Sequence, residues 1–346
     1  MRPFRDSTEP GKNPASGRGK LRERMSRDGY LFFRGLLPRG DVAAVHRRIA
    51  AIALEAGWLS RQHGSIECVA DPAGFCVDPE PEYLAVIERF NRVFEFQALS
   101  HHPALVNLIE ELLGDEVLVH PKPLPRMIFP SRVAYTTPAH QDYPNIQGTT
   151  EVYTAWIPLM DCTSECGGLC LAEGSHTEGV FEFGIGNGAG GIEIIDPLTG
   201  RWAGGEFKAG DVLLFHSLTV HKGVPNVGKR LRMSVDARYQ RVRDPFNPEN
   251  ADRPYGAPAT WEELYAHWTD AQRARLAYYW ERANLTFKPF DRTWFDRRDA
   301  LGFELGEQGD SRARSVLLRI MMRDPDPEKR GRAKRLLPTL SKLEAP

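Results

Sequence analysis

The feature that most constrains the fold is a central stretch of short β-prone runs, from about residue 116 to residue 240, separated by Gly and Pro. The runs read EVLVH, VYTAWIPL, GLCLA, DVLLFH and RMSVDARY. Several short strands at close spacing are typical of a sandwich or barrel, because a parallel sheet needs a helix between successive strands. The sequence therefore predicts a β sandwich or barrel rather than a parallel α/β sheet.

Helices are predicted before this core. Residues 40–57 place Val45 and Ile49 at helical spacing among further apolar residues. Two more helices are expected over about 81–99 and 103–113, because apolar residues recur there on one face. The predicted order is therefore supporting helices first, followed by the β core.

We divide the chain into three parts. Residues 1–20 are expected to form a disordered tail, residues 21–245 the β domain with its N-terminal helices, and residues 246–346 a helical extension. Within the extension, RDALGFELGEQGDSRARSVLLRIMMRDPDPEKRGRAKRLL looks like one HEAT-like repeat unit. A single unit cannot bury its own apolar face. We therefore expect it to pack on the core or on a second copy of the chain in a homo-oligomer.

One insertion in the β region is unusually rich in glycine. Residues 177–208 include GIGNGAGG and DPLTGRWAGG, which are long for a loop of a barrel. Two interpretations stay open: a mobile flap over a site, or a passive surface insertion.

The composition limits the binding partners and the cellular compartment that we expect for the protein. The 45 Lys and Arg residues balance 46 Asp and Glu residues, so no overall field favours nucleic acid or an anionic membrane. No apolar run approaches the ~20 residues that span a bilayer, and the N-terminus lacks the apolar part of a secretory signal. The five cysteines are an odd number, and their spacing fits no common zinc pattern. A cytoplasmic protein with a small-molecule partner is expected.

The residues most indicative of chemistry are His140-Gln141-Asp142. Residues i and i+2 of a strand point to the same side, so His140 and Asp142 can aim at one point. His221 follows a later β-prone run. Two histidines and one carboxylate form the facial triad of non-haem iron(II) oxygenases. An H-x-D pair alone is weak, since it occurs by chance in many chains.

Between about residues 27 and 240 the sequence resembles the phytanoyl-CoA dioxygenase family of iron(II)- and 2-oxoglutarate-dependent oxygenases. The resemblance lies in RDGYLFFRGLL, HPALVNLIEELLG, AHQD, TAWIPLMDCTSECGGLCLAEGSH and GDVLLFHSLTVHKGVPNVGKRLRMSVDARY, in this order. It implies a mainly β fold with flanking helices: a double-stranded β-helix, or cupin-like jelly roll. The implied cofactors are Fe(II), 2-oxoglutarate as cosubstrate, and O2.

The resemblance also implies a metal-ligand set. The iron histidines of the family fall on His140 and His221, and its carboxylate falls on Asp142. His216 lies five positions before His221 and is the competing candidate, although the alignment of the motifs favours His221.

A second implied group would bind the cosubstrate. The arginine that holds the far carboxylate of 2-oxoglutarate falls on Arg232, and Ser234 completes an R-x-S pair on the same side of the strand. Arg230 is the alternative arginine. Trp156 matches a position near the cosubstrate, and a purely structural role in the core is equally compatible with the sequence.

Substrate-binding candidates come from the neighbourhood of the metal motif. The set predicted to contact substrate is Arg126, Tyr143 and Asn145, with Lys122, Gln147 and Arg238 as further candidates. Arg126 with Lys122 would suit a polar or anionic substrate, although each charge taken singly is more often structural or solvated.

These expectations lead to one principal function and two alternatives. The principal one is a dioxygenase that hydroxylates an unactivated C–H bond of a small molecule, with release of succinate and CO2. In related halogenases a small residue replaces the carboxylate, so Asp142 favours hydroxylation. The alternatives are a cupin-like metalloenzyme that does not use 2-oxoglutarate, and a non-catalytic binding protein that uses its helical tail.

Overall fold

A six-stranded sheet is the main scaffold of the protein, whose computed structural model describes residues 1–8, 14–131, 136–256 and 259–340. The strand order is β2, β10, β5, β12, β3, and β4 pairs along another part of β12. All of these pairings are antiparallel. The strands are β2 (Tyr30–Phe33), β3 (Val117–Val119), β4 (Leu124–Ile128), β5 (Tyr153–Pro158), β10 (Val212–His216) and β12 (Arg232–Arg241).

A smaller sheet completes the β core, in the order β1, β9, β6, β11. Its strands are β1 (Arg2–Pro3), β6 (Leu169–Ala172), β9 (Trp202–Gly204) and β11 (His221–Gly223). Side chains from both sheets share one hydrophobic core, in which the rings of Trp156 and Phe207 lie 4.5 Å apart. The two sheets confirm the predicted jelly-roll architecture. A separate pair, β7 (Phe183–Ile185) and β8 (Ile192–Ile194), lies in the glycine-rich insertion.

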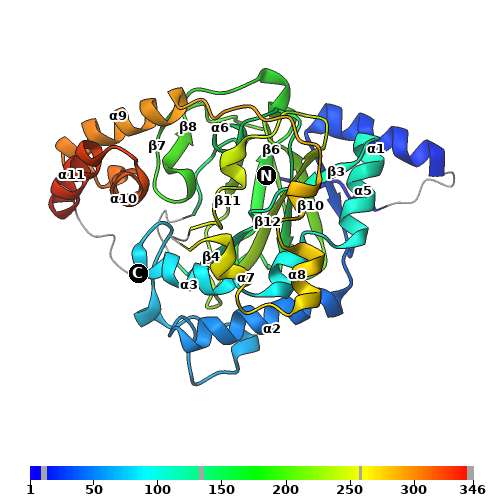
Figure 1. The fold of residues 1–346 in the computed structure, drawn as a ribbon, viewed down its shortest axis with the longest axis horizontal. Coiled ribbons are helices and arrows are strands. Elements are labelled where there is room, and N and C mark those ends of the chain that lie inside the picture. The colour runs from blue at the N-terminus through cyan, green and yellow to red at the C-terminus, as the bar shows by residue number, and fades with distance from the viewer. Residues whose placement is uncertain (9–13, 132–135, 257–258, 341–346) are drawn as a thin grey trace.

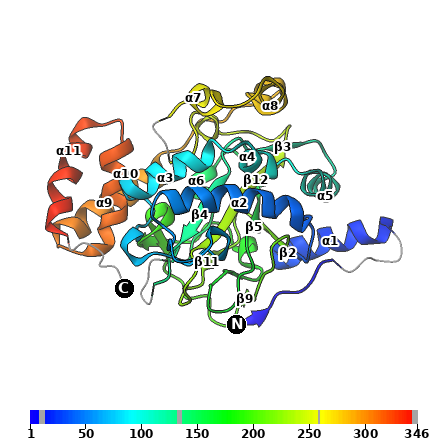
Figure 2. The same cartoon turned by 90° about the horizontal axis from the view of Figure 1, so that it is seen from below.

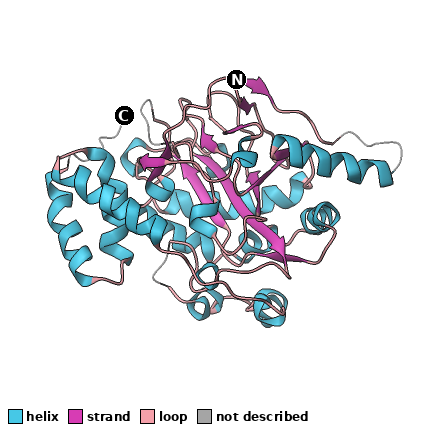
Figure 3. Ribbon diagram, turned by 90° about the horizontal axis from the view of Figure 1, so that it is seen from above, coloured by secondary structure: helices cyan, strands magenta, loops and turns pink. Residues whose placement is uncertain are grey.

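Helices surround the strands (Figure 3), and the N-terminal helices pack against the large sheet (Figure 2). They are α1 (Pro14–Asp28), α2 (Arg39–Glu55), α3 (Pro81–Asn91), α4 (Phe94–Leu99) and α5 (Pro103–Leu113). Helix α2 buries Val45 and Ile49 as its spacing predicts, and ends where Gly57 takes a left-handed conformation, φ +77°. The single helix predicted over 81–99 is two helices, because Val93 is extended (φ −74°, ψ 115°).

The predicted disordered tail over residues 1–20 is wrong where the structure describes that segment. Strand β1 pairs with β9, and α1 begins within the segment. The ring of Phe4 lies 5.1 Å from that of Phe32 and 5.5 Å from that of Phe207. Residues 9–13 lie outside the described residues. A segment with so few apolar residues has no detectable period, so one anchoring ring with distant partners leaves no local signal.

The C-terminal extension contains two groups of helices. Helices α7 (Trp261–Tyr265) and α8 (Asp270–Leu276) share an apolar cluster with Phe246. Helices α9 (Thr293–Glu307), α10 (Arg314–Arg323) and α11 (Pro327–Leu336) cover the segment interpreted as a HEAT-like unit, at the end of the molecule opposite α1 (Figure 1). None of the described helices is both long and apolar enough to cross a membrane.

The HEAT-like unit finds its apolar partner within the same chain. Ile185 of β7 belongs to the cluster that α9–α11 form. The backbone N–H of Gly188 donates to Ser315 Oγ at 3.1 Å. The unit therefore packs on the insertion at 177–208. The homo-oligomer through this extension stays a prediction.

Replacing the anchoring ring at the N-terminus tests the correction to the tail. We expect Phe4→Ala to lower the free energy of unfolding by about 2 kcal/mol, because a partly buried ring loses less than the 3–5 kcal/mol of a fully buried one. Urea unfolding measures the change. Ile195→Ala is the control, since Ile195 is 67% exposed, and should leave stability unchanged. Equal stability of Phe4→Ala and wild type would show that residues 1–8 do not anchor on the core.

Candidate active site

Three buried side chains converge between the two sheets. One ligand atom from each of His140, Asp142 and His221 lies within 4.8 Å of the others, and none of the three residues is more than 5% exposed. His140 and His221 are held by an antiparallel backbone bridge, in which each N–H donates to the carbonyl of the other at 2.9 Å. The smaller sheet therefore positions both imidazoles.

The carboxylate of Asp142 points to the same place, but the local backbone differs from the strand that the sequence predicted. Asp142 lies not on a strand but at the start of the short helix α6 (Tyr143–Ile146), with φ −74° and ψ −32°. Its backbone N–H donates to the carbonyl of Ser217 at 3.0 Å. The turn into α6 thus aims the carboxylate at the histidines.

The hydrogen bonds of the two imidazoles leave one nitrogen of each free for a metal. The Nδ1 atom of His140 lies 2.8 Å from the carbonyl of Pro138, and the Nδ1 atom of His221 lies 3.0 Å from that of Thr219. A carbonyl only accepts, so Nδ1 carries the proton in both rings. The Nε2 lone pairs are then available, an arrangement common among metal-binding histidines.

The carboxylate of Asp142 is fixed by two partners. Thr154 Oγ1 donates to its Oδ2 at 2.6 Å, and Arg238 Nη2 lies 3.3 Å from its Oδ1. Burial alone would raise the pKa of Asp142, but the charge of Arg238 and the hydrogen bond from Thr154 hold it below its ordinary value. Burial lowers the pKa of His140 to about 3. Neutral imidazoles and an ionised carboxylate are the forms that bind a divalent metal.

His216, the competing candidate, lies outside this cluster. Its Nε2 atom is 3.4 Å from Glu151 Oε1, and its Nδ1 accepts from the backbone N–H of Leu218 at 3.1 Å. Both ring nitrogens thus have partners of their own, and the structure places His221, not His216, beside His140 and Asp142.

The R-x-S pair lies on the inner side of β12 and is incompletely satisfied. Arg232 Nη1 donates to the carbonyl of Gly168 at 3.0 Å. Its Nε and the Oγ of Ser234 are buried and have no hydrogen-bond partner among the described residues. Because buried polar groups are normally paired, two adjacent unpaired groups indicate a ligand. A carboxylate fits them, since it accepts from guanidinium and hydroxyl alike.

The other two residues considered for the cosubstrate site are Trp156 and Arg230, and their contacts differ. The ring of Trp156 lies 5.8 Å from the guanidinium of Arg232 and also packs on Phe207, so this residue is both a core residue and a neighbour of the arginine. Arg230 points elsewhere, because its Nη2 donates to the carbonyl of Asp161 at 3.1 Å.

A cavity of about 360 Å³ opens beside the cluster and is lined by His140 and Asp142. Of the residues predicted to contact substrate, Arg126 and Asn145 line it, as do Lys122 and Arg238. Tyr143 is not among the described residues that line it, although it directly follows Asp142 in the chain. The reason is the turn into α6, where successive side chains no longer alternate as on a strand.

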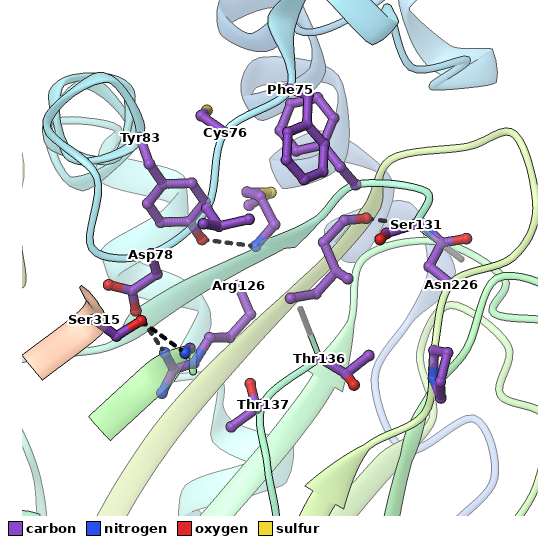
Figure 4. A pocket seen from close by; sticks show the side chains of 16 residues that line it. Phe75, Cys76, Asp78, Tyr83, Arg126, Ser131, Thr136, Thr137, Asn226 and Ser315 are labelled. Atoms are coloured by element: carbon purple, nitrogen blue, oxygen red, sulfur yellow. Dashed lines mark hydrogen bonds and ion pairs between the residues drawn. The ribbon is translucent and has the colours of Figure 1, made fainter. Parts of the chain in front are cut away.

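Gln147 has a structural role instead. Its side chain binds the backbone of Asp291 in both directions, at 2.8 and 2.7 Å. A smaller pocket of about 30 Å³ shares Arg126 with the main cavity, and Figure 4 shows Arg126 beside Asp78 at its edge.

Two sets of residues escaped the sequence analysis. Thr154 could have been found, since it lies two residues before Trp156 and therefore on the same side of β5. Arg298, Arg319 and Arg323 of the HEAT-like unit also line the cavity. No spacing or motif connects them to the metal motif, because only the tertiary fold brings them there.

A jelly roll that buries two histidines and one carboxylate around a common point is the arrangement found in non-haem iron(II) oxygenases, and the unpaired arginine and serine of β12 fit a carboxylate such as that of 2-oxoglutarate. Within that class, the chain belongs to the phytanoyl-CoA dioxygenase (PhyH) family, whose model matches residues 25–234. The match ends before the helical extension. It confirms the family resemblance, the enzyme class and the Fe(II), 2-oxoglutarate and O2 cofactors.

The chain is similar to two hydroxylases. A 1-deoxypentalenic acid 11-beta-hydroxylase of Streptomyces exfoliatus is 29% identical over 253 residues, which cover 68% of this chain and 83% of that protein. Its counterpart in Streptomyces arenae is 30% identical over 252 residues, with the same coverage. The solved structure of the epimerase SnoN, in complex with Fe3+, alpha ketoglutarate and nogalamycin RO, is 22% identical with a TM-score of 0.50. It covers 71% of this chain and 93% of that one, and shows the shared fold.

Substitution of each histidine in turn tests the geometry of the cluster. We expect His221→Ala to weaken Fe(II) binding by more than the about 10–100-fold that follows loss of an outer hydrogen-bond partner of a metal ligand. His216→Ala should leave the affinity unchanged. Anaerobic titration calorimetry measures both. If His216→Ala weakens Fe(II) binding and His221→Ala does not, His216 is the metal ligand.

A substitution of Thr154 tests whether its hydrogen bond orients the carboxylate of Asp142. Thr154→Val keeps the shape of the side chain and removes the 2.6 Å hydrogen bond to Asp142. We expect Fe(II) affinity to fall by about 10–100-fold, and the thermal midpoint to fall as well, because a buried carboxylate loses one of its partners. Thr177→Val, on an exposed residue that bonds only to the nearby Gly174 carbonyl, is the control. Wild-type affinity in Thr154→Val would mean that the carboxylate orients itself without this bond.

Proposed function

We propose that the protein hydroxylates an unactivated C–H bond of a polar or anionic small molecule, with conversion of 2-oxoglutarate and O2 to succinate and CO2. The observation that carries this proposal is the position of the His140, Asp142 and His221 cluster. It opens into a cavity whose walls are rich in arginine and lysine. The relatives support it, since both are named as hydroxylases of an acid.

In this proposal the three clustered residues hold the metal. His140 and His221 would bind through Nε2 and Asp142 through its carboxylate, which leaves positions open for other ligands. Arg232 and Ser234 would hold the far carboxylate of 2-oxoglutarate, with the planar guanidinium matching it in two hydrogen bonds. Bound iron and 2-oxoglutarate supply the oxidising chemistry that an unactivated C–H bond requires.

The protein's own residues then control which bond reacts. The cavity walls orient the substrate relative to the metal ligands, and orientation of this kind accounts for much of an enzyme's rate and selectivity. Asp142 occupies one ligand position itself, and this favours transfer of oxygen over transfer of an external anion. Burial of the cluster keeps bulk water away from the reacting centre.

The test is to add Fe(II) and 2-oxoglutarate to the protein without oxygen. We expect the weak visible charge-transfer band of a keto acid chelated to iron, since the three protein ligands leave positions for it. Arg232→Ala should raise the 2-oxoglutarate concentration for half-maximal absorbance by about tenfold or more, because a charge-assisted hydrogen bond is lost. Arg230→Ala is the matched control and should behave as wild type.

Each other outcome is informative. If iron binds but no band forms, the protein is a metalloenzyme that does not use 2-oxoglutarate. If Arg230→Ala weakens the band and Arg232→Ala does not, the cosubstrate is held by Arg230, just before β12. If iron does not bind, the oxygenase proposal is wrong for this chain.

A further inference from the structure

The HEAT-like unit forms one wall of the metal-site cavity. Arg298 of α9 and Arg319 and Arg323 of α10 line the same cavity of about 360 Å³ as His140 and Asp142. This unit lies outside residues 25–234, which match the family. The part of the chain that lies beyond the shared oxygenase core therefore contributes to the place where substrate would bind.

This wall is firmly connected to the core. Arg319 Nη2 donates to Asp78 Oδ1 at 3.1 Å, and Asp78 also accepts from Tyr255 Oη at 2.7 Å and lies 3.4 Å from Arg126 of β4. Arg319 Nη2 further contacts the carbonyl of Gly188 at 3.3 Å. Burial alone would raise the pKa of Asp78, but the charges of Arg319 and Arg126 hold it below its ordinary value, so it stays ionised.

Basic side chains outnumber acidic ones in the lining of the cavity. As lined by the described residues, it contains seven Lys and Arg side chains and four Asp and Glu side chains. One of the four is Asp142, which belongs to the proposed metal site. Most of the cations have an acidic partner of their own: Lys122 has Asp252 at 2.8 Å, and Arg298 has Asp299 at 2.7 Å. The charge that can attract an anion is therefore that of a cation without an acidic partner.

Arg323 is the exception among these cations. It lies one helical turn from Arg319 on α10, so the two side chains are neighbours on one side of the helix. The side chain of Arg323 is exposed and forms no hydrogen bond or ion pair with any residue that the structure describes, although the charges of Asp78 and Asp252 act on it from a distance. Arg319 is only 9% exposed, and its Nε is buried without a partner among the described residues. Arg319 is thus held in place by Asp78, and the adjacent guanidinium of Arg323 retains unused donors beside it at the cavity wall.

We propose that Arg319 and Arg323 form an oxyanion subsite that holds a carboxylate or phosphate group of the substrate. The inference rests on the proposed function and adds the substrate class and the residues that recognise it. Planar guanidinium groups suit both oxyanions, because they offer paired donors. With the anion held on α10, the substrate spans the cavity toward His140 and Asp142, so the distance between anion and C–H bond selects the position that reacts.

The test measures anion binding directly, with no turnover. Inorganic phosphate and hexanoate are titrated separately into the iron-free protein by calorimetry. We expect one of them to bind, and Arg323→Gln to weaken that binding by about tenfold or more, since a charge-assisted hydrogen bond is lost. Phosphate or hexanoate as the preferred probe distinguishes a phosphorylated from a carboxylic substrate.

Arg332→Gln is the matched control. Arg332 belongs to α11 of the same unit, pairs with Glu307, and does not line the cavity. The same charge is lost, so a general electrostatic effect would weaken both variants equally, whereas the proposed subsite requires an effect of Arg323→Gln alone. Because the Arg323 side chain has no hydrogen-bond or ion-pair partner among the described residues, its variant should fold as wild type, and the thermal midpoint checks this.

Two results would overturn the subsite: neither anion binds wild type, or Arg323→Gln binds as wild type does. The charge-transfer band with Fe(II) and 2-oxoglutarate separates this failure from that of the proposed function. Arg323→Gln should retain the full band, since Arg232 is the proposed partner of the cosubstrate. Loss of the band in Arg323→Gln would show that Arg323 serves 2-oxoglutarate, and would overturn the subsite as well.

Discussion

The backbone bridge between His140 and His221 is the constraint on which the site depends. Its two 2.9 Å hydrogen bonds set the two residues opposite each other, and the ring centroids lie 4.2 Å apart. Each ring is then oriented by a carbonyl two residues before it in the chain. The imidazoles thus owe their position to backbone geometry, which substitutions of neighbouring side chains change little.

The third member of the cluster depends on the large sheet instead. Asp142 is buried, and an unpaired buried carboxylate would be very unfavourable. Thr154 of β5 and Arg238 of β12 satisfy it, and these two residues face each other across the strand pair. The same side of β12 carries Arg232 and Ser234. A single strand therefore both stabilises the carboxylate of the proposed metal site and presents the groups proposed for the cosubstrate, which connects the two halves of the site.

The sequence predicts those features that depend on residues close together in the chain. The helix at α2 and the β-rich centre are visible as periodicity, and the motif around His140 combined with the family resemblance is enough to select the three residues that converge. Three features cannot be predicted from the sequence, because each depends on partners far away in the chain. They are the position of Asp142 on a turn, the anchoring of Phe4 on the core and the location of Arg323 at the cavity. A charge on a helix has the same local pattern whether it faces solvent or a cavity.

The glycine-rich insertion shows why such long-range features matter. Its composition suggested either a flap or a passive loop, yet two of its glycines have a packing reason. A Cβ at Gly186 would lie 2.9 Å from Pro138, next to the metal motif, and a Cβ at Gly191 would lie 2.7 Å from Val316 of α10. Gly191 also has φ +71°, a conformation that favours glycine. The insertion therefore needs glycine to fit between the metal-binding segment and α10. Larger residues at these positions would push α10, and with it Arg319 and Arg323, away from the cluster. These close contacts thus set the position of the proposed anion subsite relative to the proposed metal ligands. The same contacts require the glycines that made the role of the insertion hard to predict from the sequence.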